Sequence, residues 1–192
     1  KKIKMKIHYL SVAAALAVVS IGCNGTQSSE EETKTQPEQS KTIYEAKIDA
    51  LNTSVTGGAT TGTARFAVEG ETMTVTIDIK NAPAGIEHWQ HFHGFTNDNE
   101  AACATMAEDK NGDGIIDVVE TEPVSGTTMV PFNELPAKME VGSDTYPKAA
   151  EDGSYHYEAK VSVKDLDEAF AKAFGNAGIN LDKRVLYIHG VP

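Results

Sequence analysis

The chain has 192 residues, of which 17 are Lys or Arg and 28 are Asp or Glu, so its formal net charge is −11. One domain is the default at this length, and two cysteines are too few for a disulfide scaffold. The acidic balance argues against nucleic acid or an anionic lipid surface as a partner, since both attract Lys and Arg.

Residues 1–22 have the pattern of a secretory signal peptide. Lysines at positions 1, 2, 4 and 6 precede an apolar run at 10–19, which is too short to span a bilayer comfortably. The pair Gly22-Cys23 resembles the lipobox of bacterial lipoproteins, in which this cysteine becomes the lipidated N-terminus. That resemblance implies lipidation of Cys23 and membrane contact through the lipid alone. Simple cleavage nearby, with Cys23 as a free thiol, is the alternative, and both predict export.

A flexible acidic tether is expected at 23–42. Four basic residues and no acidic ones lie in 1–22, so the remainder carries a formal net charge of −15. Residues 24–41 hold no large apolar side chain and cannot offset the entropy of ordering. The folded domain is therefore expected at 43–192.

Period-two alternation dominates that domain and predicts β-strands. Apolar residues alternate with polar ones from Thr72 to Ile79, and again from Ser154 to Val163. Glycine-rich and proline-containing segments separate these runs as turns. Further strands are predicted at 43–50, 63–69, 86–93, 125–132 and 184–189.

One helix is predicted near the C-terminus. Asp165 is a candidate N-cap, Leu166, Phe170 and Phe174 fall on one face, and Gly175 ends the helix. Short strands at this spacing favour an all-β, antiparallel sandwich or barrel.

Residues 109–120 satisfy the twelve-residue EF-hand pattern at every position. Four carboxylates within twelve residues repel each other unless a cation lies among them, and an acidic surface turn is the alternative. The expected Ca²⁺ ligands are Asp109, Asn111, Asp113, the carbonyl of Ile115, Asp117 through water, and bidentate Glu120.

The flanks of this loop favour a structural calcium site. Residues 101–108 are a candidate helix before the loop, whereas Thr121-Glu122-Pro123 is expected to stop a helix soon after Glu120. A sensor that opens a helix pair is therefore not expected. Extracellular modules of this sort bind Ca²⁺ at roughly 10⁻⁴–10⁻³ M.

Three histidines lie within six residues, at His88, His91 and His93. Alternate residues of a strand share a face, so His91 and His93 can direct both imidazoles to one metal ion, while His88 falls on the opposite face of a regular strand. His189 shares a face with Val185 and Tyr187 in the last predicted strand and is a candidate third ligand, with His88 as fourth. Imidazole suits several metals, so copper or zinc stays open, and satisfied packing histidines are the alternative.

Cys103 and His156 complete the candidate groups. Cys103 is a possible soft metal ligand, although burial as a small apolar side chain is the favoured interpretation. His156 lies on the polar face of its strand and is expected to be exposed.

The segments 61–79, Gly85-Ile-Glu-His88, His91-Phe-His-Gly94 and the late His189 resemble the CHRD domain family. This resemblance implies an antiparallel, Greek-key-like β-sandwich in a secreted protein, without an established catalytic role. The same residues are similar to copper/zinc superoxide dismutase, which implies copper ligands at His91, His93 and His189. However, no histidine lies between Gly94 and Tyr155, so the bridging and zinc-site histidines of that enzyme have no counterpart.

The expected protein is thus an envelope lipoprotein, on the periplasmic or cell-surface side, that binds Ca²⁺ and copper or zinc without turnover. A copper redox enzyme acting on superoxide is the first alternative, although the strong negative charge disfavours it unless Arg65, Arg184 and lysines form a positive funnel. An adhesion or scaffold module, in which the histidines only pack, is the second.

Overall fold

A computed structural model describes residues 40–57, 59–175 and 178–190. The expected signal peptide, the lipidation site at Cys23 and nearly all of the tether lie outside these residues. The first strand begins at Lys41, two residues earlier than the predicted start of the domain.

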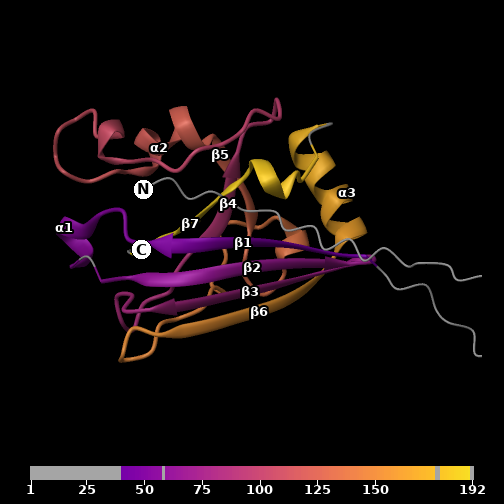
Figure 1. Ribbon diagram of the computed structural model, residues 1–192, viewed down its shortest axis with the longest axis horizontal. Coiled ribbons are helices and arrows are strands. Elements are labelled where there is room, and N and C mark those ends of the chain that lie inside the picture. The colour runs from indigo at the N-terminus through magenta and orange to yellow at the C-terminus, as the bar shows by residue number, and fades with distance from the viewer. Residues whose placement is uncertain (1–39, 58, 176–177, 191–192) are drawn as a thin grey trace, which may run out of the picture.

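A four-stranded antiparallel sheet forms one layer of the molecule (Figure 1). The period-two prediction is confirmed in β3, where Met73, Val75, Ile77 and Ile79 are buried and the intervening residues are not. The strands lie in the order β1-β2-β3-β6, with bounds Lys41–Asp49 (β1), Thr61–Glu69 (β2), Thr72–Lys80 (β3) and Tyr155–Ser162 (β6).

A three-stranded antiparallel sheet forms the second layer, in the order β5-β4-β7. Its strands are β4 (Gln90–Gly94), β5 (Thr127–Pro131) and β7 (Val185–Ile188), each shorter than predicted. In the stretch predicted to begin β4, Glu87 makes only a single bridge, to Lys148. The two sheets confirm the expected mostly-β, sandwich-like class.

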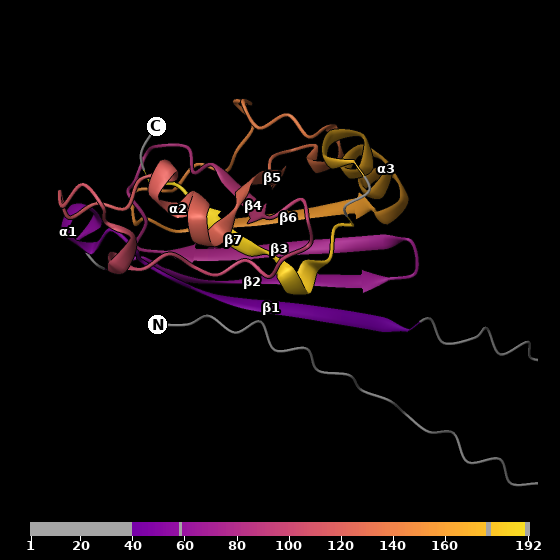
Figure 2. The ribbon, with the colours of Figure 1, turned by 90° about the horizontal axis from the view of Figure 1, so that it is seen from above.

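The core lies between the two sheets. Phe66 of β2, Phe92 of β4 and Phe132 pack against one another, with ring centroids 4.7 to 5.4 Å apart. Figure 2 shows the two layers from above, with β4 and β7 over the four-stranded sheet. Because Phe92 points into the core, its neighbours in β4 point to the other side of their sheet.

The predicted C-terminal helix is present as α3 (Val163–Phe174), with Leu166 and Phe170 buried and Gly175 at its end. Its N-cap is Ser162 and not Asp165, because the Ser162 hydroxyl accepts a hydrogen bond from the Asp165 backbone N–H at 3.2 Å. Other short elements are α1 (Thr53–Thr56) and three 3₁₀ turns, η1 (Met106–Glu108), η2 (Pro136–Lys138) and η3 (Leu181–Lys183).

The helices around residues 109–120, called the calcium-type loop below, differ from the prediction. Only η1 forms before the loop, not a helix over 101–108. After it, α2 (Val118–Ser125) continues through Pro123, which was expected to stop it. Asp117 and Glu120 form a reciprocal capping box at its start, and the Thr121 hydroxyl donates to the Val118 carbonyl at 2.7 Å. The capping box fixes the first turn of this helix, and Pro123, its sixth residue, removes one backbone hydrogen bond without ending it.

Within the described ranges, no helix has the length and apolar composition needed to cross a bilayer.

Candidate metal centre

His91 and His93 lie on the face of β4 opposite to Phe92, away from the core between the sheets. Both are buried, with 3% and 1% of their surface exposed. Their rings stack with centroids 4.9 Å apart. The predicted shared face is therefore present, and it belongs to the outer side of the three-stranded sheet.

The neighbouring strand β7 adds a third histidine. Tyr187 is the register partner of His91, so the alternate position His189 follows on the same face just beyond β7. The His189 ring lies 4.8 Å from that of His91, centroid to centroid. The predicted meeting of His189 with the His-x-His pair is thus present.

The ring nitrogens of these histidines have unequal partners. His93 Nδ1 lies 3.0 Å from the Gly126 carbonyl, which requires an N–H at Nδ1 and leaves a lone pair at Nε2. That Nε2 lies 3.1 Å from the Thr128 hydroxyl. By contrast, His91 Nδ1 and His189 Nε2 are buried without any hydrogen-bond partner, and they are the two such side-chain atoms in the described ranges.

Burial keeps these imidazoles neutral. Desolvation, with smaller contributions from His189 and His93, lowers the pKa of His91 from 6.5 to about 3. Desolvation also lowers the pKa of His93 to about 4, and it lowers the pKa of His189. A metal ion needs the neutral imidazole, so His91 and His93 are in the binding form well below pH 7.

His88 stands apart from the other three. It is buried, stacks on Tyr155, and both of its nitrogens face backbone carbonyls: Nδ1 that of His189 at 2.8 Å and Nε2 that of Pro83 at 2.9 Å. A neutral imidazole has a single N–H, so His88 donates to one of these carbonyls, and both of its nitrogens face the backbone and not the other imidazoles.

The segment between β4 and β5 covers the histidines. Tyr187 packs edge-on against His93 at 4.8 Å, and its hydroxyl bonds to Ser125 Oγ at 2.7 Å and to the Ala104 N–H at 2.9 Å. Gly126 has φ +76°, and a Cβ there would overlap the Gly94 carbonyl, so only glycine brings its own carbonyl to His93. Figure 1 shows α2 over β4 and β7, on the side away from the four-stranded sheet.

The calcium-type loop is ordered by its own carboxylates. Asp109 accepts from the N–H groups of Gly112 and Gly114 at 2.7 and 2.9 Å. Glu120 Oε1 accepts from those of Lys110 and Asn111 at 2.7 and 3.2 Å. Each carboxylate oxygen has two lone pairs, so these bonds leave acceptor capacity for a cation. The remaining expected ligands, Asp113, Ile115 and Asp117, lie in the same loop, where Asp113 accepts from the Ile115 N–H and Asp117 caps α2.

Asn52 ties this loop to the end of β1. Its side-chain amide donates to the Ile116 carbonyl at 2.9 Å and accepts from the Ile116 N–H at 2.8 Å. The paired bonds fix the loop backbone against the sandwich. No motif in the sequence pointed to Asn52, because the contact joins residues 64 positions apart.

The remaining candidates have varied environments. Cys103 is a half-buried free thiol whose pKa is raised by desolvation, and it lines the same cavity as the histidines. His156 is exposed as expected, with Nδ1 2.7 Å from Asp78 Oδ1. Arg184 is buried and donates to the carbonyls of Phe95, Gly178 and Ile179, so it cannot contribute to a positive funnel for superoxide.

As the side chains stand, no three His, Cys, Asp or Glu residues in the described ranges form a group that could hold a metal ion. The imidazoles of His91 and His93 are stacked, with an angle of 28° between their planes, and are not turned towards a common point. A bound metal would therefore require ring rotation. No family model, curated protein or solved structure matches the chain.

Proposed function

We propose that the protein binds one copper or zinc ion through His91, His93 and His189, and Ca²⁺ through residues 109–120, without turnover. The finer assignment of the sandwich to a CHRD-like, Greek-key type belongs to the same proposal, as does attachment to the cell envelope through Cys23. The observation that carries it is the pair of buried nitrogens, His91 Nδ1 and His189 Nε2, that have no partner.

An unpartnered buried nitrogen has a cost that needs an explanation. Leaving such a group unsatisfied costs about 1–3 kcal/mol, and most buried polar side-chain atoms in proteins have a partner. Two such nitrogens on rings 4.8 Å apart point to a shared ligand. A metal ion satisfies lone pairs of this kind.

The spacing of the rings suits a single ion. Imidazoles that bind zinc through nitrogens at about 2.0–2.1 Å in tetrahedral geometry have centroids roughly 5 Å apart. The two measured centroid distances, from His91 to His93 and to His189, are 4.9 and 4.8 Å. Rotation of the rings at nearly constant centroid positions would aim their nitrogens at one point.

His93 has the support that metal-bound histidines commonly have. A ligating imidazole usually donates its other N–H to a carbonyl or carboxylate, which fixes the tautomer and the ring. His93 donates from Nδ1 to Gly126, so its Nε2 can exchange the Thr128 hydroxyl for a metal. We assign His88 a positioning role, because its Nδ1 faces the backbone carbonyl of the candidate ligand His189 at 2.8 Å.

The calcium part of the proposal rests on the complete EF-hand pattern and on the anchoring of the loop by Asn52. Since only a 3₁₀ turn precedes the loop, we propose a structural role for the ion and not that of a sensor.

Metal content of the purified full chain tests the transition-metal site. After equilibration with zinc or copper and removal of the excess, we expect about one equivalent in the wild type and a loss of it in His91→Ala and His189→Ala. His156→Ala is the matched control, because this exposed histidine lies on the other sheet. Absence of metal in the wild type would favour the scaffold alternative, and superoxide turnover by the copper form would favour the redox enzyme.

A further inference from the structure

A cavity of about 840 Å³ opens beside the histidines and reaches both sides of β7. Leu186 and Ile188 line it from one face of the strand, and Tyr187 and His189 from the other. Leu51 beyond β1 and Val118 at the start of α2 also line it. This volume lies within the range of pockets that hold small organic molecules, roughly 300–1,000 Å³.

The cavity has a mainly apolar lining with polar groups among it. Its aliphatic lining comes from β1, β3, β7 and the calcium-type loop, and the histidines are among its polar groups. His91 is 3% exposed, lines the cavity and has an unpartnered Nδ1, and the unpartnered Nε2 of His189 is buried in the same lining. Because both nitrogens are buried, the ring rotation that a bound metal requires would also turn them towards a molecule inside the cavity.

The charges around the cavity favour a neutral ligand. Among the described lining residues, Asp49 and Asp117 carry charge and none is Lys or Arg. Asp49 is paired with Lys47 at 2.6 Å, and Asp117 caps α2 through a bond to the Glu120 N–H at 3.0 Å. In the metal-free protein an anion would meet no lysine or arginine in this lining, and a cation would compete for carboxylates that are already engaged.

We propose that this cavity binds a neutral, mainly apolar organic molecule with one hydroxyl-type polar end, which lies against His91 and His189. A hydroxyl both donates and accepts, so it matches either tautomer of a neutral imidazole and can also be a ligand of a bound metal ion. The proposal specifies a ligand class for the site of the proposed function. Binding of the apolar part of this ligand does not depend on a metal.

Trp89 provides a built-in reporter. It is the single tryptophan of the chain, lines the cavity, is 39% exposed and stacks on Tyr146 at 5.5 Å between centroids. The test uses the exported full chain with Cys23→Ser, so that acyl chains and detergent do not enter the titration. The neutral probe N-phenyl-1-naphthylamine is titrated against metal-free and zinc-treated protein, followed by its own emission and by that of Trp89.

Two adjacent valines give a matched pair. Val118 lines the cavity, whereas Val119 is 73% exposed and does not line it, and both lie in the first turn of α2. We expect saturable binding in the wild type, at least tenfold weaker binding in Val118→Asp, and less than a twofold change in Val119→Asp. Equal effects of the two variants, or no saturable binding with or without zinc, would overturn the proposal.

Competition by naphthalene, 2-naphthol and 2-naphthoate tests the polar end. We expect 2-naphthol to displace the probe about tenfold better than naphthalene, and His91→Phe to abolish that difference. In the metal-free protein, a preference for 2-naphthoate would refute the neutral class. If the protein takes up no zinc but binds the probe as expected, the metal proposal fails and the cavity proposal stands.

Discussion

The outer faces of the two sheets place histidine in opposite environments. On the four-stranded sheet, His156 of β6 is exposed and pairs with Asp78 of the neighbouring strand β3. On the three-stranded sheet, His91 and His93 are buried beneath the segment that contains α2, and His91 retains an unpartnered nitrogen. The same residue type is a solvated surface group in one place and a neutral, poorly satisfied ligand candidate in the other. The covering segment makes the difference.

The largest expected effect of a single substitution separates the two sides of β4. Phe92→Ala removes a ring that packs on Phe66 and Phe132 and should lower the free energy of unfolding by about 3–5 kcal/mol. His91→Val removes an unpartnered nitrogen and should change it by less than about 1 kcal/mol while abolishing metal uptake. Urea denaturation of the metal-free proteins and zinc titration measure both. A loss in His91→Val as large as in Phe92→Ala would show that the His91 ring is a core element.

Acid should destabilise the metal-free protein through the buried histidines. The pKa of His91 falls from 6.5 to about 3 on folding and that of His93 to about 4, so the unfolded chain binds more protons below pH 6.5. The contribution of these histidines to the free energy of unfolding is therefore fully present above pH 6.5. It is lost as the pH falls, by roughly 3 kcal/mol for each histidine at pH 4. Urea midpoints from pH 7 to pH 4 measure this slope, which His91→Val should reduce.

The surface histidine supplies the control for the acid experiment. His156→Gln is measured beside His91→Val, because this histidine is exposed whereas His91 is buried. If His156→Gln and His91→Val reduce the slope equally, burial is not its origin.

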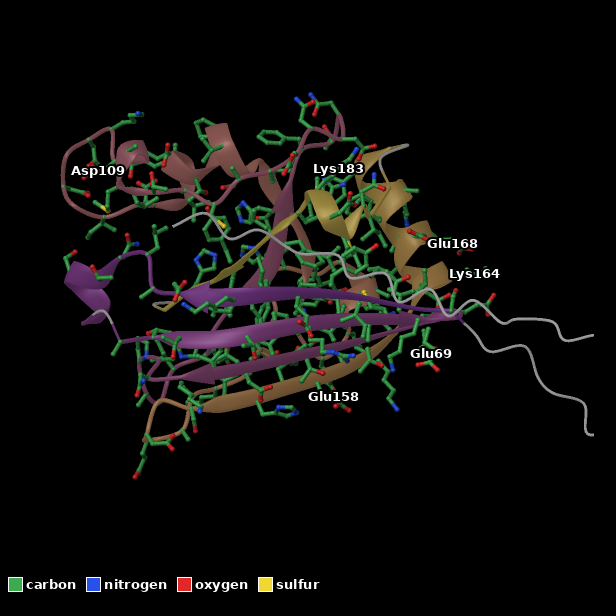
Figure 3. The ribbon with its side chains drawn as sticks, in the orientation of Figure 1. Glu69, Asp109, Glu158, Lys164, Glu168 and Lys183 are labelled. Carbon is green, nitrogen blue, oxygen red and sulfur yellow. The ribbon has the colours of Figure 1, made fainter. Side chains whose placement is uncertain are left out.

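Calcium should stabilise the covering segment and, through it, the whole domain. At a Ca²⁺ concentration one hundred times the dissociation constant, the free energy of unfolding should rise by about 2.7 kcal/mol, and Asp109→Asn should abolish the rise. Glu158→Gln is the control, since Figure 3 shows Glu158 on the four-stranded sheet, far from Asp109. Thermal unfolding with and without a chelator measures the effect. A wild-type melting curve that is insensitive to chelation would refute the structural calcium site.

The smallest effect is expected on the exposed face. Asp78→Asn removes a pair whose side chains are 54% and 58% exposed, so the free energy of unfolding should change by no more than about 1 kcal/mol. Zinc uptake should be unchanged. A change in zinc stoichiometry here would show that the two faces are coupled.

Much of the sandwich could be predicted from alternation alone. The pattern of β3 and β6 marks one buried face, and the Leu166–Phe170 spacing marks α3. The cap at Ser162 was missed although Ser162-x-x-Asp165 is a usual capping spacing. The rule that a proline ends a helix is wrong for Pro123, which is the sixth residue of α2.

Part of the site could be predicted as well. Alternation placed His91 and His93 together, and the late strand supplied His189. Alternation could not show that this face lies outside the sandwich under another segment. Nor could it show that both nitrogens of His88 face carbonyls. Those facts depend on contacts between distant residues, as does the anchor from Asn52 to Ile116.

The position of β7 has a consequence for folding kinetics. His88 and His189, whose contact closes one side of the histidine group, are 101 positions apart in the chain. Contacts of such long range form slowly, because a long loop must close before any interaction compensates for its entropy. The histidine group should therefore assemble in a late step, after the consecutive antiparallel strands β1, β2 and β3 have paired. A partly folded chain would hold His91 and His93 but lack His189, so it should capture metal poorly.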